Sequence, residues 1–260
     1  MGWVGLIYSA RTGANAPIFL DILRLYVPRG AIGCDVTFGK GSFWSRKAYA
    51  HVSEHSRFTD LDAGGPCLSD LPYGDETMGY HVLDPPYICG AFRPKASQRA
   101  QQTYSDFSHR YGNHSGTGYK GIYYHPAVEA IYADGLREAW RVLSPGGVQI
   151  TKVADEVSNH KQHLTHCYIV EVAQQLGFEA LDLFVVVRAD RPHGKRIKQQ
   201  QHALKNHSFF LVFKKPRRVP NARSVPARIA MVRSSRAKPA PRSVTLLRMG
   251  NDDDKRTKGG

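Results

Sequence analysis

The chain alternates short apolar segments typical of buried strands with amphipathic segments of helical period. The expected strands span 31–36, 57–61, 79–83, 148–153, 181–188 and 207–214, and the expected helices span 16–26, 42–50, 126–142 and 163–176. Strands that alternate with helices usually lie parallel, with helices on both faces of the sheet. No helix separates the last two strands, so the final strand is expected to be antiparallel. The sequence therefore predicts an α/β, doubly wound, mostly parallel sheet with an antiparallel last strand.

The chain of 260 residues is long enough to bury a core. We expect one domain over residues 1–215 and a basic, disordered tail over residues 216–260, which is rich in Arg, Pro, Ser and Ala. The formal net charge is +14, and residues 214–260 carry 14 basic and 3 acidic side chains. A charge of this size indicates a polyanion partner, although basic tails also occur as solubilising extensions.

The hydropathy, the N-terminal segment and the cysteines of the sequence all predict a cytoplasmic protein. No apolar run reaches the length of a membrane span, and the N-terminal segment lacks the features of a signal peptide. We therefore expect no membrane partner, and the sequence does not indicate an oligomeric state. None of the four cysteines forms a Cys-x-x-Cys pair, so free thiols are expected rather than a disulfide framework. These cysteines are Cys34, Cys67, Cys89 and Cys167.

Two acidic segments follow the first two expected strands. In the first, Asp35-Val36-Thr37-Phe38-Gly39-Lys40-Gly41, glycines let the backbone approach a ligand, and amides at the start of the next helix would face it. An ordinary strand-to-helix turn has the same pattern. In the second, Asp60 ends its strand, where a carboxylate suits the two hydroxyls of a ribose. Asp62 is the alternative, but Asp60 lies nearer the strand end.

The most specific motif is Asp84-Pro85-Pro86-Tyr87, which follows the strand 79–83. Two consecutive prolines fix an extended backbone that has no free amides, while their carbonyls stay available as acceptors. The motif thus gathers a carboxylate, a carbonyl and an aromatic ring. It lies at the carboxyl end of a strand, where open α/β sheets bind their ligands.

The motif Asp84-Pro85-Pro86-Tyr87 resembles the catalytic motif of the amino-methyltransferases that act on DNA adenine or cytosine. The segment Asp35–Gly41 resembles their glycine-rich cofactor motif, and it precedes the catalytic motif, as in one group of that family. Residues 141–147, Arg-Val-Leu-Ser-Pro-Gly-Gly, are similar to the helix-to-strand turn of class I methyltransferases. The resemblance covers about residues 9–214.

The resemblance implies a class I methyltransferase fold, S-adenosylmethionine as cofactor, and methyl transfer to the exocyclic amino group of a DNA base, with adenine favoured. The implied cofactor-binding residues are Asp35, Thr37, Gly39, Gly41, Asp60 and Asp70, of which Asp60 matches the ribose acid and Asp70 the position at the cofactor's adenine. The implied catalytic residues are Asp84, Pro85, Pro86 and Tyr87.

The implied mechanism needs no metal. The Asp84 carboxylate and the Pro85 carbonyl would accept hydrogen bonds from the amine and localise its lone pair toward the methyl donor. Tyr87 would stack on a base that has left the duplex. The remaining candidates for metal ligands are His160, His163, His166 and Cys167. On one helix they would spread around the surface, so no metal site is predicted.

The sequence contains less information about which nucleic acid is the substrate. No separate target-recognition domain is visible, and only the loops 93–121 and 189–206 are available to contact a substrate. The first of these interleaves aromatic with basic residues, which suits a nucleic-acid surface. DNA is favoured over RNA. The alternatives are an RNA guanine amino-methyltransferase and a non-catalytic nucleic-acid-binding protein with this fold.

Overall fold

The computed structural model describes residues 6–60, 67–87, 122, 124–158, 160–189 and 199–217, all within a compact unit of Met1–Pro220. Its main sheet contains β1 (Ala10–Thr12), β2 (Gly33–Asp35), β3 (Arg57–Phe58), β4 (Met78–Leu83), β5 (Leu143–Val153), β8 (Glu179–Val187) and β9 (His207–Lys214). The helices are α1 (Asn15–Tyr26), α2 (Arg46–Tyr49), α4 (His125–Val142) and α5 (Thr165–Leu176). Each of the six expected strands and four expected helices has a counterpart, but β3 covers only the start of the expected strand 57–61, and α2 is shorter than the expected helix 42–50.

The seven strands are arranged in the order β1-β8-β9-β5-β4-β2-β3. The pairs β2–β3, β2–β4, β4–β5 and β1–β8 are parallel. Strand β9 runs antiparallel to both of its neighbours, β5 and β8. The predicted α/β sheet, mostly parallel with an antiparallel last strand, is confirmed.

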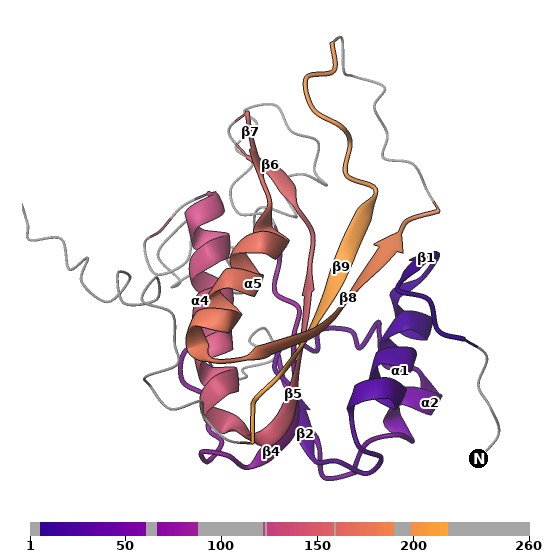
Figure 1. Ribbon diagram of the computed structural model, residues 1–260, viewed down its shortest axis with the longest axis vertical. Helices are drawn as coiled ribbons and strands as arrows, with labels where there is room; N and C mark the ends of the chain where they lie inside the picture. Colours follow the sequence, from indigo (N-terminus) through magenta and orange to yellow (C-terminus); the bar gives the residue numbers. More distant parts are fainter. Residues whose placement is uncertain are drawn as a thin grey trace, which may run out of the picture. The chain divides into compact units, whose positions relative to one another are not determined.

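Helices cover both faces of the sheet, with α4 and α5 on one side and α1 and α2 on the other (Figure 1). The alternation of side chains along β9 shows how the two layers form, because successive residues of a strand point to opposite faces. Phe209, Leu211 and Phe213 belong to the core cluster that includes α4 and α5. Phe210 and Val212 belong to the cluster that includes α1 and α2. The sheet is thus doubly wound, as predicted.

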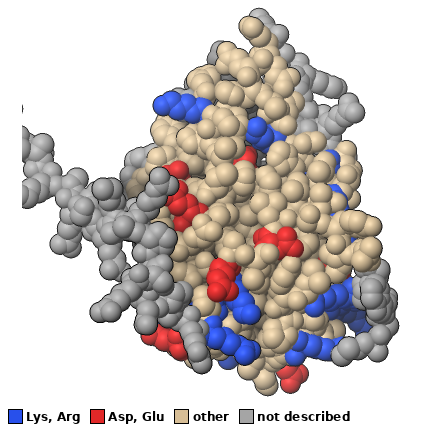
Figure 2. Space-filling model, viewed as in Figure 1, with Lys and Arg blue, Asp and Glu red and all other residues tan. Residues whose placement is uncertain are grey.

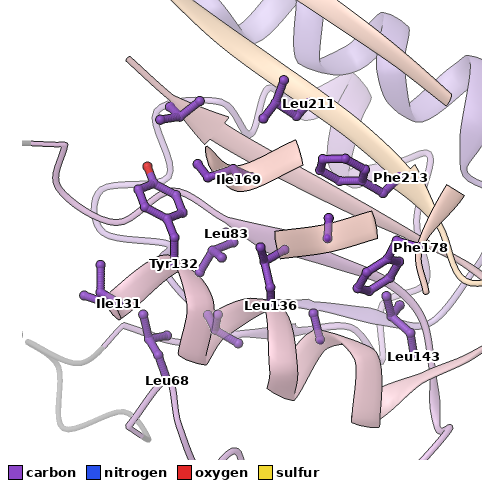
Figure 3. Close-up of a cluster of buried hydrophobic side chains, with 14 of the residues drawn as sticks. Leu68, Leu83, Ile131, Tyr132, Leu136, Leu143, Ile169, Phe178, Leu211 and Phe213 are labelled. Atoms are coloured by element: carbon purple, nitrogen blue, oxygen red, sulfur yellow. The ribbon is translucent and has the colours of Figure 1, made fainter. Parts of the chain in front are cut away.

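Helix α4 packs tightly on β4 and so fixes the strand that carries the Asp84 motif. Its buried residues recur at helical spacing, and Ile131, Tyr132 and Leu136 are inaccessible to solvent. These three side chains lie with Leu83 in one apolar cluster (Figure 3). A β-carbon at Gly135 would lie 2.8 Å from the end of the Leu83 side chain, so any larger residue would force Leu83 to shift.

Two parts of the fold have no counterpart in the sequence prediction. Strand β1 is a three-residue edge strand, too short to show an alternating pattern. A two-stranded antiparallel hairpin of β6 (Glu156–Ser158) and β7 (Lys161–His163) lies where a loop and the start of a helix were expected. Its residues are mostly polar, so apolar periodicity could not indicate it.

Other expectations concern residues that the structure does not describe or describes only in part. The loop 93–121 and Asp62 lie outside the described residues, and the tail 216–260 is described only at Pro216 and Arg217. In the described part, no helix is long and apolar enough to cross a membrane. The described cysteines, Cys34, Cys67 and Cys167, are free thiols.

Candidate active site

The carboxyl ends of β2, β3 and β4 meet at one edge of the sheet because the three strands are parallel. Asp35 is in register with Phe58 of β3 and with Val82 of β4. The segments after these strands therefore converge and line one cavity of about 220 Å³. Its lining residues are Thr37, Phe38, Gly39, Lys40, Ser42, Asp60, Asp84, Pro85, Pro86 and Tyr87. The cavity thus brings together predicted residues from all three strand ends, whereas the predicted Asp35 and Gly41 do not line it.

Asp35 does not line this cavity. The residue is 2% exposed, and its Oδ1 accepts from the Thr37 amide at 3.0 Å and the Thr37 hydroxyl at 3.3 Å. The indole Nε1 of Trp44 donates to Oδ2 at 2.7 Å. Burial raises the pKa of Asp35 to about 6, against the opposing effect of these hydrogen bonds. Asp35 therefore fixes the glycine-bearing loop by its hydrogen bonds to Thr37 and Trp44.

The helix after this loop begins later than expected. The expected helix 42–50 is only α2, a single turn over Arg46–Tyr49, with the Ser45 side chain accepting from the Ala48 amide. Phe43 and Trp44 are instead buried in the core, and the Trp44 bond to Asp35 fixes them outside a helix. The expectation that amides at a helix start face the ligand is therefore wrong, because the loop itself faces the cavity.

Two glycines allow the backbone conformation of the loop. Gly39 and Gly41 have φ angles of +52° and +64°, which residues with a β-carbon rarely adopt. At Gly41 a β-carbon would also lie 2.6 Å from the Phe38 ring. The amide of Gly39 donates to Oδ2 of Asp60 at 2.9 Å, so the loop after β2 is fixed to the acid that follows β3. Asp60 is largely buried, with 7% of its surface exposed.

Thr37 joins the glycine loop to the Asp84 motif. Its Oγ1 accepts a hydrogen bond from the backbone amide of Asp84 at 2.6 Å and donates to Asp35 Oδ1. Thr37 is itself buried, so the linkage is shielded from water. The Thr37 hydroxyl thus fixes the position of the carboxyl end of β4 relative to that of β2.

The Asp84-Pro85-Pro86-Tyr87 motif forms one wall of the cavity. Asp84 is partly exposed, and the Tyr87 hydroxyl donates to its Oδ1 at 2.5 Å. Burial raises the pKa of Asp84 above its usual range, and burial and the nearby Asp84 charge raise that of Tyr87. Because neither proline has an amide hydrogen, this wall offers acceptors rather than backbone donors.

The sequence reasoning missed Lys152, which is near the end of β5. Lys152 is 2% exposed, and its Nζ lies 5.4 Å from the centre of the Tyr87 ring. Its charge lowers the pKa of Asp84, opposing the effect of burial. The sequence holds one signal for this residue: a single lysine within the expected buried strand, in Gln149-Ile150-Thr151-Lys152-Val153. Buried lysines are rare unless they are paired.

Asp70 does not take part in the cavity. It is exposed on a turn closed by its amide and the carbonyl of Cys67 at 3.0 Å, and it is not among the lining residues. Its role at the adenine of a cofactor stays a prediction.

The histidine cluster does not lie on one helix, and the expectation that it would is wrong. His160 is in a turn, His163 is in β7, and His166 is in α5, where its Nδ1 lies 2.7 Å from Oδ1 of Asp155. The ring of His163 stacks on that of His125. Among the residues that the structure describes, no group of three or more His, Cys, Asp or Glu side chains is placed to hold a metal ion.

Comparison with known proteins gives only structural similarities. No protein-family model and no curated protein matches the chain. One similar structure is a candidate DNA modification methylase from Thermus thermophilus in complex with S-adenosyl-L-methionine, with 15% identity and a TM-score of 0.33. The match covers 74% of this chain and 59% of the other, so the chain spans little more than half of that methylase.

Two further similar structures are methyltransferases of other kinds. An S-adenosylmethionine-dependent methyltransferase from Methanosarcina mazei has 10% identity and a TM-score of 0.40, and the match covers 75% of this chain and 97% of the other. TrmN from Thermus thermophilus has 15% identity and a TM-score of 0.43, and the match covers 76% of this chain and 48% of TrmN. The strand order and the antiparallel β9 agree with the class I methyltransferase fold expected from the sequence motifs. The proposed activity rests on the geometry of the site.

Proposed function

We propose that the chain is an S-adenosylmethionine-dependent methyltransferase that methylates the exocyclic amino group of a nucleic-acid base, with DNA adenine as the favoured target. One observation carries the proposal. The Thr37 hydroxyl ties the glycine loop to the backbone of Asp84, so that a loop of cofactor-binding type and an Asp-Pro-Pro-Tyr motif line the same cavity. Methyl transfer requires this proximity, because donor and acceptor must be held in line.

The residues of the cavity fit the cofactor. Gly39 leaves its backbone open to a ligand, since the nearest atom to an added β-carbon would be Asp60 Oδ2 at 3.7 Å. Asp60 follows β3 at the cavity, where its carboxylate would accept from ribose hydroxyls. The cavity of about 220 Å³ is smaller than typical ligand pockets of roughly 300–1,000 Å³, so the described residues enclose part of such a ligand.

The bound cofactor would supply an electrophilic methyl group. The chemistry of this chain is then to prepare the amine, whose lone pair is delocalised into the base. Asp84 and the Pro85 carbonyl would accept hydrogen bonds from the amino group and stabilise the positive charge that develops on its nitrogen. The nitrogen would gain the methyl group as the sulfur–methyl bond breaks and leaves a thioether, and it would lose a proton, for which the Asp84 carboxylate in the cavity wall would be the acceptor.

Tyr87 has two connections that suit this reaction. Its hydroxyl donates to Asp84 Oδ1 at 2.5 Å, which fixes the direction of the carboxylate. Its ring is half-buried at the cavity wall, where it would stack on the target base. The aspartate at the head of the motif is what favours adenine over cytosine, through the family resemblance.

The charge distribution supports a nucleic-acid partner mainly through the tail. Figure 2 shows acidic and basic side chains interspersed on the same face of the described part, with basic ones near the lower edge and others near the top and right of the view. Residues 214–260 carry 14 of the 36 basic side chains of the protein. We therefore expect the tail to strengthen binding to phosphates without selecting a base.

The experiment is to incubate the full chain with isotope-labelled S-adenosylmethionine and either duplex DNA or RNA, and to identify the methylated nucleoside by mass spectrometry. Labelled N6-methyladenine from DNA is the expected result. Labelled methylguanine from RNA would replace DNA by RNA as the substrate. Binding to nucleic acid without any transfer would contradict the enzymatic proposal and support a binding protein.

A further inference from the structure

A buried lysine stands behind the Asp84 motif. Lys152, the penultimate residue of β5, is 2% exposed, and its Nζ donates to the Ser208 hydroxyl of β9 at 2.6 Å. The same Nζ lies 5.1 Å from the centre of the Phe210 ring and 5.4 Å from that of the Tyr87 ring. The ammonium is thus held between the sheet and the motif.

Tyr87 links Lys152 to Asp84, because its ring faces the Lys152 Nζ at 5.4 Å and its hydroxyl donates to Asp84 Oδ1. An ammonium buried without a counter-charge is strongly destabilised. Burial lowers the pKa of Lys152 below its usual range, and the carboxylate of Asp84 raises it. In return, the lysine charge lowers the pKa of Asp84. Each group therefore favours the charged form of the other.

Other titratable groups face the pair from the neighbouring elements. Asp35 of β2 disfavours the charged form of Asp84, and Arg188, which follows β8, disfavours that of Lys152. Tyr132 of α4 donates its hydroxyl to the backbone carbonyl of Lys152 at 2.7 Å. Among the residues that the structure describes, Lys152 favours the ionised form of Asp84.

A second buried lysine provides a comparison. Lys215, 5% exposed, follows β9 at the opposite end of the sheet from the cavity. Its Nζ lies within 2.9 Å of Glu76 Oε1 and 2.8 Å of the carbonyls of Trp140 and Leu143, so its three donors have structural partners. The Nζ of Lys152, by comparison, has one hydrogen bond to the residues that the structure describes, the bond to Ser208. The Asp84 carboxylate in the cavity wall raises the pKa of Lys152, opposing the effect of burial.

We propose that Lys152 is a positioning residue for methyl transfer: its ammonium holds the Tyr87 ring, which is hydrogen-bonded to Asp84, and favours the carboxylate form of Asp84 against the effect of burial. This inference rests on the proposed function, because a carboxylate is needed to accept the target amine's hydrogen. A protonated Asp84 would offer one oxygen as a donor and would lose the negative charge that stabilises the transition state.

The direct test is a pH titration of Asp84 by carbon-13 NMR, in the full chain without cofactor, with the signal assigned from Asp84→Asn. In Lys152→Met the Asp84 midpoint should rise by about 1 to 3 pH units, the effect of losing a nearby opposite charge. Lys152→Arg should return the midpoint toward that of the wild type. Lys215→Met is the control, in which the midpoint should stay unchanged.

The same variants separate an electrostatic role from a structural one in the methyl-transfer assay. For Lys152→Met, the acid limb of the kcat profile should move to higher pH by the same amount as the NMR midpoint. Lys215→Met should lower thermal stability and leave the limb in place. If folded Lys152→Met had the same acid limb in its kcat profile and the same Asp84 midpoint as the wild type, the proposal would be overturned.

A reciprocal measurement covers the case in which Lys152→Met does not fold. Coupling between two titrating groups is mutual, so Asp84→Asn should lower the pKa of Lys152, followed through the NMR signal of its side chain. An unchanged Lys152 titration in Asp84→Asn would refute the coupling. These titrations need no substrate: a wild type that transfers no methyl group would contradict the proposed function, while the Asp84–Lys152 coupling would still be measured.

Discussion

The backbone amide of Asp84 donates to the hydroxyl of Thr37 at 2.6 Å, across 47 residues of sequence. Thr37 follows β2 and Asp84 follows β4, and the two strands are paired in parallel. This hydrogen bond fixes the proposed catalytic motif relative to the loop expected to hold the cofactor. The distance between the methyl donor and the amine depends on that relation, so the bond matters for the rate as well as for stability.

The first prediction follows from this bond. Thr37→Val keeps the shape of the side chain but leaves the Asp84 amide without its acceptor, which costs about 1–3 kcal/mol of stability. We expect kcat to fall more than cofactor affinity, because the relation between the two halves of the site is lost. Thr59→Val is a matched control at the neighbouring strand end. Equal kcat in the two folded variants would contradict the role of Thr37.

The second prediction concerns the ribose site. Asp60→Ala should weaken S-adenosylmethionine binding, measured by calorimetry, by about 1–3 kcal/mol, the range for hydrogen bonds to a charged group. Asp155→Ala is the control, because Asp155 is similarly buried, at 8% exposure, and does not line the cavity. If Asp60→Ala bound the cofactor as tightly as the wild type, Asp60 would not be the ribose ligand.

The third prediction concerns the pH dependence of stability at Asp35. Its pKa is raised to about 6 in the folded state, so its contribution to stability is fully present below its unfolded pKa of about 3.9 and is lost as pH rises through 6. Between these values the wild type should lose up to about 3 kcal/mol of unfolding free energy relative to Asp35→Asn, at about 1.36 kcal/mol per pKa unit. Urea unfolding at several pH values measures it. If the unfolding free energies of the wild type and Asp35→Asn changed with pH in the same way, the pKa of Asp35 would not be raised in the folded state.

The sequence predicted the strands and helices because their apolar periods are clear, and β4 and β9 agree to within one residue. It predicted the cavity wall because Asp84-Pro85-Pro86-Tyr87 is specific. It could not place the start of α2, since Phe43 and Trp44 suit a helix by type and are taken into the core by tertiary contacts. It missed Lys152 because the interaction with Asp84 joins residues from different strands, and no local pattern records such an interaction.

The fourth prediction concerns the tail. Truncation after Pro216 should leave a folded protein that binds S-adenosylmethionine, because the cavity residues all precede it. The truncated protein should bind DNA more weakly and with a shallower salt dependence, since fewer counterions are released. DNA affinity measured over a salt series for both lengths provides the comparison. Equal slopes would show that the tail does not contact DNA, and an altered methylation pattern would show that it selects sequence.

The central claim is that Asp84 prepares the target amine, and single-turnover methyl transfer by Asp84→Ala tests it most directly. Saturating S-adenosylmethionine is used, after calorimetry has shown that the variant still binds it. We predict near-complete loss of transfer with cofactor affinity largely retained, because Asp84 acts on the amine and not on the cofactor. Transfer within about tenfold of the wild type, roughly 1.4 kcal/mol of barrier, would contradict the assignment of Asp84.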